Sequence, residues 1–188
     1  MTVWFSSDMH LGHAGVIKFC NRPFETVEEM DEAIVDKWNK TVRGTERVYV
    51  LGDVSFHNPK VGVPLLRRLN GEKILVLGNH DKYSMTQYRQ AGFVHICNET
   101  VIPMLGRRVR MSHFPYLPRP EENEPDHEMR YPHLRPRRDG NEFLLCGHVH
   151  DRWKTRERMV NVGTDVWNFR PVSHSVIESL FAKILEAP

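Results

Sequence analysis

The chain has 188 residues, which is enough for one domain with a substantial core and a tight fit for two. Hydrophobic residues make up 40% and charged residues 27%, a balance typical of soluble globular proteins and unlike that of disordered or fibrous chains. The 26 lysines and arginines nearly balance the 24 aspartates and glutamates, so the net charge of +2 gives no argument for nucleic-acid binding.

The cysteines and the first residues bear on the compartment. Cys20, Cys97 and Cys146 form an odd set without close spacing, which is typical of reduced thiols in a reducing compartment. The N-terminus has no basic region followed by a long apolar stretch, and no apolar run is long enough to cross a bilayer. We therefore expect a cytoplasmic protein with no membrane partner.

The first half of the chain alternates between predicted strands and helices. Short apolar runs that end in small or polar residues predict strands at 3–5, 47–51 and 73–77. Helices are expected from Thr26, which with Glu29 can form a capping box, to about residue 42, and over 63–69 and 84–91. Three strands separated by helices indicate a parallel sheet of an α/β fold.

The second half has a different pattern. Residues 100–105 and 108–111 flank Gly106 and predict a hairpin, and further strands are expected at 143–146 and 159–162. A helix is predicted over 173–185. These elements indicate a second, mixed sheet. With no repeat and no linker, residues 1–188 are predicted to form a single domain.

Five predicted strands end at residues able to bind a metal. In strand order these are Asp8 and His10, Asp53, Asn79 and His80, His113, and His148 and His150. Sites in open α/β sheets lie at the carboxyl ends of strands, so these side chains are expected on one rim. Carboxylate, amide and imidazole groups suit Mn²⁺, Fe²⁺, Co²⁺ or Zn²⁺, and the absence of thiolates argues against a structural zinc finger. Even without His80, the remaining seven side chains are too many for one tetrahedral ion and suit two ions that share a carboxylate.

The motifs also resemble those of a known family. Asp8-Met9-His10, Gly52-Asp53, Gly78-Asn79-His80-Asp81, His113 and Gly147-His148-Val149-His150 match, in order, the motifs of the calcineurin-like metallophosphoesterases. The stretch from Asp8 to Phe24 is similar to a small bacterial and phage branch of that family. The resemblance spans most of the chain, and five ordered motifs are far more specific than any one alone.

The resemblance implies a fold and a set of residue roles. The fold would be a two-sheet β-sandwich flanked by helices, with four α/β/β/α layers. One ion would be held by Asp8, His10, Asp53 and His150, and the other by Asp53, Asn79, His113 and His148. Asp53 would bridge the ions. His80 would contact the substrate phosphate or the leaving oxygen, and Asp81 would orient it.

These roles predict a phosphoesterase. Two ions about 3.5–4 Å apart can form a bridging hydroxide and clamp a phosphoryl group for in-line attack. We expect two divalent ions, with manganese favoured over iron, zinc, cobalt or nickel, and a small or nucleotide-type phosphodiester as substrate. A phosphomonoesterase and, less favoured, a non-catalytic metal-bound binding protein are the alternatives. A long nucleic acid is not favoured because the chain is short, and the oligomeric state is left open.

Two further groups of residues are candidates for substrate binding. His13 and Arg22 lie near the site in the sequence and are assigned to substrate binding, with local packing as an equally weighted alternative. The segment 115–140 is predicted to be a long loop or lid. Its arginines can meet a phosphorylated substrate, or the segment can be a solvated mixed-charge loop; they are Arg119, Arg130, Arg135, Arg137 and Arg138. Trp153 and Trp167 are interpreted as core residues.

Overall fold

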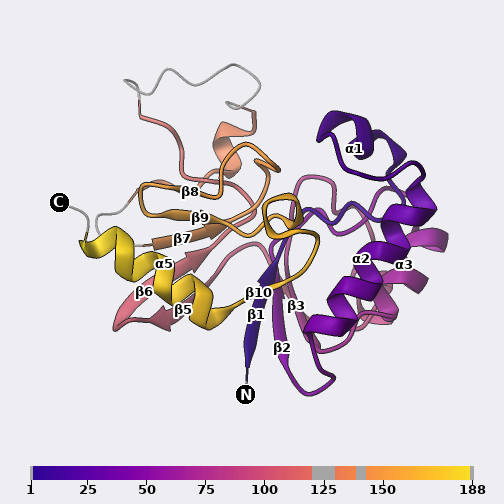
Figure 1. Ribbon diagram of the computed structural model, residues 1–188, viewed down its shortest axis with the longest axis horizontal. Helices are drawn as coiled ribbons and strands as arrows, with labels where there is room; N and C mark the ends of the chain where they lie inside the picture. Colours follow the sequence, from indigo (N-terminus) through magenta and orange to yellow (C-terminus); the bar gives the residue numbers. More distant parts are fainter. Residues whose placement is uncertain (1, 120–129, 139–142, 187–188) are drawn as a thin grey trace.

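The first sheet carries the parallel strands predicted from the sequence. The computed structural model describes residues 2–119, 130–138 and 143–186. Five strands lie in the order β10-β1-β2-β3-β4 (Figure 1). Strands β1 to β4 pair in parallel, and β10 pairs antiparallel with β1. Their bounds are β1 (Val3–Ser6), β2 (Arg47–Val50), β3 (Glu72–Val76), β4 (Phe93–Cys97) and β10 (Val172–Ser173).

Helices pack on one face of this sheet. They are α1 (Ala14–Phe19), α2 (Val27–Thr41), α3 (Pro59–Arg67) and α4 (Met85–Gln90). The hydroxyl of Thr26 accepts a hydrogen bond from the amide of Glu29 and so caps α2, but the expected capping box is only half formed, because the Glu29 carboxylate accepts from the amide of Glu25. Trp38 of α2 is buried against Val48 and Val50 of β2, which places an apolar core between the helices and the sheet.

The second sheet contains the predicted hairpin. Its five strands lie in the order β5-β6-β7-β9-β8. Strands β6, β7 and β9 pair in parallel, whereas β5 and β8 are antiparallel to their neighbours. The bounds are β5 (Thr100–Met104), β6 (Arg107–Met111), β7 (Phe143–Cys146), β8 (Thr155–Arg156) and β9 (Met159–Asn161).

A second core joins the two sheets. One cluster contains residues of both sheets. Phe5 of β1 and Leu51, which directly follows β2, pack there with Phe143 and Leu145 of β7. Because successive side chains of a strand point to opposite faces, β2 can supply Val48 and Val50 to the helix side and its continuation, Leu51, to the other side. Helix α5 (His174–Glu186) packs against this cluster, with the ring of Phe181 4.1 Å from that of Phe143 (Figure 1). The expected two-sheet sandwich flanked by helices is confirmed.

The structure differs from the sequence prediction mainly in short elements. Helix α3 begins at Pro59, four residues before the predicted start, because Asn58 caps it and Pro59 occupies the first turn, where a missing N–H is tolerated. Strands β8 and β10 were not predicted, because two residues each are too few to show an alternation of apolar and polar side chains. Helix α1 and strand β4 were also not predicted.

The segment 115–140 is described only in part. Residues 120–129 and 139–140 lie outside the described residues, so an ordered lid over the whole segment stays a prediction. In the described part, a short 3-10 helix spans Pro132–Leu134, and Tyr116 is buried against the outer face of the second sheet. Within the described chain, no helix has the length and apolar character needed to cross a membrane.

The turn after β2 leaves no room for a side chain. Gly52 has a φ of +85°, and a methyl group there would lie 2.6 Å from the backbone nitrogen of Gly78. We expect Gly52→Ala to lower the free energy of unfolding by at least about 2 kcal/mol, since left-handed strain and a backbone clash add. Gly44→Ala is the control, because nothing lies within 4 Å of its added methyl group. Urea unfolding that gives equal midpoints for both variants would contradict this packing.

Candidate metal centre

The predicted ligands converge where the strands of both sheets end. Asp8 and Asp53 follow β1 and β2 of the first sheet, while His113 and His148 follow β6 and β7 of the second. The amide of His148 donates to both carboxylate oxygens of Asp8, at 3.1 and 3.0 Å. The amide of Gly147 donates to the carbonyl of His113 at 2.9 Å. The bonds from His148 to Asp8 therefore tie the ends of the two sheets together at one rim, and the bond from Gly147 to His113 joins the ends of β6 and β7.

The backbone is strained at most of these positions. Five of the seven predicted ligands have φ between 50° and 71°; they are Asp8, His10, Asp53, His148 and His150. Left-handed conformations cost a non-glycine residue roughly 1–3 kcal/mol each and persist only where the surrounding structure holds them. Such a concentration of strain in one set of side chains is typical of a site whose geometry is used for function.

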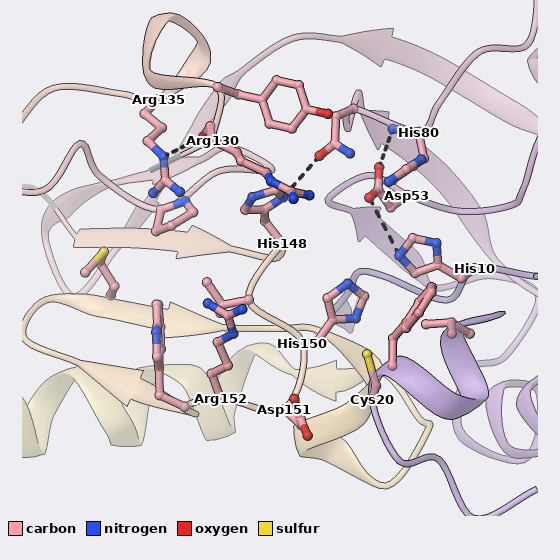
Figure 2. A pocket seen from close by; sticks show the side chains of 18 of the residues that line it. His10, Cys20, Asp53, His80, Arg130, Arg135, His148, His150, Asp151 and Arg152 are labelled. Atoms are coloured by element: carbon pink, nitrogen blue, oxygen red, sulfur yellow. Dashed lines mark hydrogen bonds and ion pairs between the residues drawn. The ribbon is translucent and has the colours of Figure 1, made fainter. Parts of the chain in front are cut away.

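The carboxylate of Asp53 lies between His80 and His10 (Figure 2). Its Oδ1 accepts a hydrogen bond from the amide of His80 at 2.8 Å. Its Oδ2 lies 3.6 Å from Nε2 of His10 and 3.5 Å from Nε2 of His113. One carboxylate therefore faces histidines from both predicted ligand sets.

Several of the converging atoms are acceptors. Nδ1 of His113 lies 2.8 Å from the carbonyl of Leu51, which can only accept, so Nδ1 donates and a neutral ring directs the lone pair of Nε2 inward. That Nε2 lies 3.1 Å from Oδ1 of Asn79, and the same oxygen lies 3.1 Å from Nδ1 of His148. Acceptors that face one another need a proton or a cation between them. The lone pairs of these oxygen and nitrogen atoms fit a divalent metal ion as its ligands.

Histidine 10 supports the same conclusion. Both of its ring nitrogens are buried and have no hydrogen-bond partner among the described residues. A buried polar atom without a partner is unfavourable, and metal coordination would relieve it. Ligand atoms of Asp8, His10 and His150 lie within 4.8 Å of one another, as do those of Asp8, Asp53 and His113.

Burial has the largest effect on the pKa values of Asp53, His148 and His80, and so on their charges. It raises the pKa of Asp53 to about 6, with Asp8 and Asp81 adding to the effect and His113 opposing it. Burial, together with nearby positive charge, lowers the pKa of His148 to about 2 and that of His80 to about 4. These two histidines are therefore neutral at physiological pH, and a neutral ring offers the lone pair that a metal ligand such as His148 requires.

His113 and His150 behave differently because carboxylates lie beside them. Burial lowers the pKa of both rings, but Asp53 and Asp8 more than offset it at His113. At His150, the hydrogen bond with Asp165 and the proximity of Cys20 and Asp8 raise the pKa to about 11. A cation held by the same carboxylates would compete with the proton at these rings.

The described contacts of Arg22 are those expected for the packing alternative. Its guanidinium donates to both carboxylate oxygens of Asp165, at 2.7 and 2.9 Å, and to the carbonyls of Met9 and Asp8. Its side chain is fully buried and is not among the described residues that line the cavity. Asp165 in turn lies 3.4 Å from Nδ1 of His150, so Arg22 is linked through Asp165 to a predicted ligand, and its assignment to substrate binding stays a prediction.

Asp81 and His13 have different surroundings. The carboxylate of Asp81 accepts hydrogen bonds from the amides of Gly78, Asp53 and Val54, at 2.7 to 3.1 Å, and so holds two ligand loops together. In the described part of the chain, the hydrogen bonds of Asp81 come from backbone amides rather than from the His80 ring. The ring of His13 stacks on Phe56 at 4.0 Å and lines the cavity.

A cavity of about 500 Å³ opens from the ligands toward a second group of residues. Arginines from two segments line it; they are Arg130, Arg135, Arg138, Arg152 and Arg156. Sequence analysis missed Arg152 and Arg156, as well as Asp165, because they lie outside the motifs. Trp153, expected in the core, is half-buried and also lines the cavity.

Known proteins match the chain along most of its length. A family model described as the calcineurin-like phosphoesterase superfamily domain matches residues 1–177. An uncharacterized protein of Methanocaldococcus jannaschii is 32% identical over 187 residues, covering 96% of this chain and 92% of that protein. The gene 66 protein of Mycobacterium phage L5 is 31% identical, with 97% and 95% of the two chains covered. A solved structure of a protein of unknown function from Aquifex aeolicus has a TM-score of 0.69 and 26% identity, covering 95% of this chain and 98% of that one.

The packing role of Arg22 can be tested by stability. Arg22→Gln should lower the free energy of unfolding by about 3–5 kcal/mol, because it leaves the buried carboxylate of Asp165 without its cation. Arg68→Gln is the control: Arg68 also forms a two-oxygen pair, with Glu32, but on the surface, so its loss should cost at most about 1 kcal/mol. If Arg22→Gln unfolds like the parent protein and only raises KM, Arg22 binds substrate.

Proposed function

Because the chain belongs to the calcineurin-like phosphoesterase superfamily, we propose that it is a metal-dependent hydrolase of phosphodiesters with a two-ion centre. The observation that carries this proposal is the position of Asp53, whose one carboxylate faces His10 on one side and His113 on the other. A carboxylate oxygen has more than one lone pair, so Oδ2 of Asp53, which both histidines approach, can bind an ion on each side.

Each ion has a proposed set of ligands. The first set is Asp8, His10, Asp53 and His150, and the second is Asp53, Asn79, His113 and His148. Bound ions would supply a nucleophile from water at neutral pH and neutralise the charge of the phosphoryl group. The mixed oxygen and nitrogen ligands favour manganese, with iron, zinc, cobalt or nickel as alternatives.

The protein's own residues prepare and orient this centre. Asp81 fixes the loops of Asp53 and Asn79 relative to each other through their backbone amides. Asp165 orients His150 through its Nδ1, and the carbonyl of Leu51 orients His113. Fixing a ligand ring through its other nitrogen also selects its tautomer, which supports metal binding. Asp81 and Asp165 are thus proposed as positioning residues.

We propose that His80 acts on the leaving group of the substrate. Its amide is held by Asp53, and its ring lies beside His10, with 5.5 Å between the ring centroids, on the wall of the cavity. Burial lowers the pKa of His80 to about 4, and an anionic phosphate ester next to the ring would raise it toward the range needed for proton donation. His80 would then contact the phosphoryl group and protonate the departing oxygen, and His13 would line the substrate side of the same wall.

The substrate preference rests on the cavity. A space of about 500 Å³ suits a small or nucleotide-type molecule better than a long nucleic acid. A phosphomonoesterase is the second candidate, and a metal-bound binding protein without catalysis is the third. Absence of hydrolysis of bis(4-nitrophenyl) phosphate with Mn²⁺ would favour the third. A single domain and a cytoplasmic location complete the proposal.

The bridging role can be tested by counting metals. Asp53→Asn should reduce the bound Mn²⁺ from two ions per chain to one or none, and should lower the rate of diester hydrolysis at least about 100-fold. Asparagine tolerates the left-handed backbone at this position, so folding should be preserved. The control is Asp36→Asn, which removes only an exposed partner of Lys40. Two ions per chain and near-normal turnover in Asp53→Asn would exclude the bridge.

A second experiment separates the two roles of His80. Nitrophenolate leaves without a proton, whereas a sugar alkoxide needs one as the bond breaks. His80→Asn should therefore retain its metals and show a steeper dependence of rate on the pKa of the leaving group than the parent enzyme. An unchanged slope with a full metal content would leave His80 as a phosphate contact only.

A further inference from the structure

One aromatic ring on the wall of the cavity is open to solvent. Phe19, the last residue of α1, is 81% exposed and lines the cavity beside the metal centre. In the described part of the chain it belongs to none of the apolar clusters that form the cores. A single exposed apolar side chain needs no explanation on an ordinary surface. On the wall of the proposed active site, however, an exposed ring offers a face that a bound ligand can cover.

His13 makes this ring one side of a corner. The centroids of the Phe19 and His13 rings are 6.5 Å apart, and the two ring planes meet at 64°. Phe56 holds His13 in place, because its ring stacks on that of His13 at 4.0 Å with only 2° between the planes. All three rings line the cavity. A planar group can therefore stack on the open face of Phe19 while its edge meets His13.

The corner depends on a glycine inside α1. A methyl group on Gly15 would lie 3.1 Å from Nε2 of His13 and 3.2 Å from Cε2 of Phe19, closer than ordinary van der Waals contact. The backbone of Gly15 is not left-handed, so its conformation does not require glycine. Glycine within a helix is less favourable than alanine. The space that Gly15 leaves open is thus occupied by the two rings of the corner.

The corner lies next to the proposed metal centre. The ring of His13 is 5.4 Å from that of His10, a proposed ligand of the first ion. Figure 2 shows Cys20, which directly follows Phe19, beside His150, another ligand of that ion. Two steps from ring to ring therefore separate Phe19 from the metal centre, a separation that one nucleotide spans between its base and its phosphate.

We propose that Phe19 and His13 form a specificity site, in which the base of a nucleotide-type substrate stacks on Phe19 while the phosphate is at the metal centre. The inference rests on the proposed phosphoesterase function and narrows its substrate to esters that carry an aromatic base. Every base has a π-face, so the site selects for the presence of a base and does not distinguish one base from another. Phe19 sets specificity and takes no part in the chemical step.

The test uses two ligands that differ only in the base. They are 2′-deoxyadenosine 5′-monophosphate and 1,2-dideoxyribose 5-phosphate, which has the same sugar ring and phosphate without the base. Calorimetric titration of the Mn²⁺-loaded parent protein should give a Kd about 5-fold to 100-fold lower for the nucleotide, as expected for one stacked base. The measured quantity is the ratio of the two Kd values, because any effect on the metal centre is common to both ligands.

The variants locate the effect. Phe19→Ala should reduce the ratio to less than about 2-fold because the stacking face is lost, and the exposure of Phe19 means that folding should be preserved. Phe19→Leu keeps an apolar side chain without a flat face and should lose the ratio as well, whereas Phe19→Trp should retain it. Val94→Ala is the control, since Val94 of β4 is 64% exposed and outside the described lining. Its ratio should equal that of the parent.

The outcomes separate this inference from the proposed function. The proposed function fails if the Mn²⁺-loaded protein hydrolyses no phosphodiester, whereas the base site is judged by the ratio of Kd values alone. Equal Kd values for the two ligands, or a parent ratio retained in Phe19→Ala, would overturn the base site. A parent ratio retained in Phe19→Leu would also overturn it, because apolar contact would then account for the effect without stacking. The same holds if the base has no effect and Phe19→Ala converts a dimer to a monomer in sedimentation, because Phe19 would then contact a second copy of the chain.

Discussion

The burial of one carboxylate, that of Asp53, between the ends of two β-sheets is the constraint on which the site depends. Burial and the neighbouring acids Asp8 and Asp81 raise the pKa of Asp53 to about 6, with His113 opposing them, so its ionised form needs compensating positive charge. His10 and His113 approach Oδ2 from two sides, and the ring nitrogens of His10 have no other partner among the described residues. The proposed pair of divalent ions would supply that charge and would use the lone pairs of the histidines.

The strands bring these groups together, and interactions outside the ligand set hold them in place. Strained, left-handed backbone persists only where the surroundings fix it. Here Asp81 fixes the loop of Asp53 through two amides, and Arg22 fixes the loop of Asp8 through its carbonyl. The contact from Arg22 through Asp165 to His150 extends the same support to the far side of the cluster. Rigid positioning of ligands before the metal arrives favours tight binding and fixed reaction geometry.

Sequence patterns predicted the parts of the fold that depend on local periodicity and on motifs. The apolar runs that became β1, β2 and β3 are buried on both faces and end in polar residues, so strand and ligand could be recognised together. Strand β10, with two residues, is defined only by its pairing with β1.

The supporting residues could not be predicted in the same way. Asp165 follows His150 by fifteen residues, and its contacts to Arg22 and His150 exist only once the chain is folded. Arg22 lies in a stretch that resembles the family's motifs. The sequence alone could not distinguish a buried arginine that pairs with Asp165 from one that contacts a phosphate. The cavity arginines Arg152 and Arg156 had no signal, because a basic residue in a loop is usually solvated.

The central claim is that one carboxylate joins two metal ions, and a manganese titration of the full chain followed by electron paramagnetic resonance tests it most directly. Two ions that share Asp53 lie about 3.5–4 Å apart and should couple magnetically. The account predicts saturation at two ions per chain and the spectrum of a coupled pair. Saturation at a single ion, or two ions that give only the spectrum of isolated Mn²⁺, would contradict it.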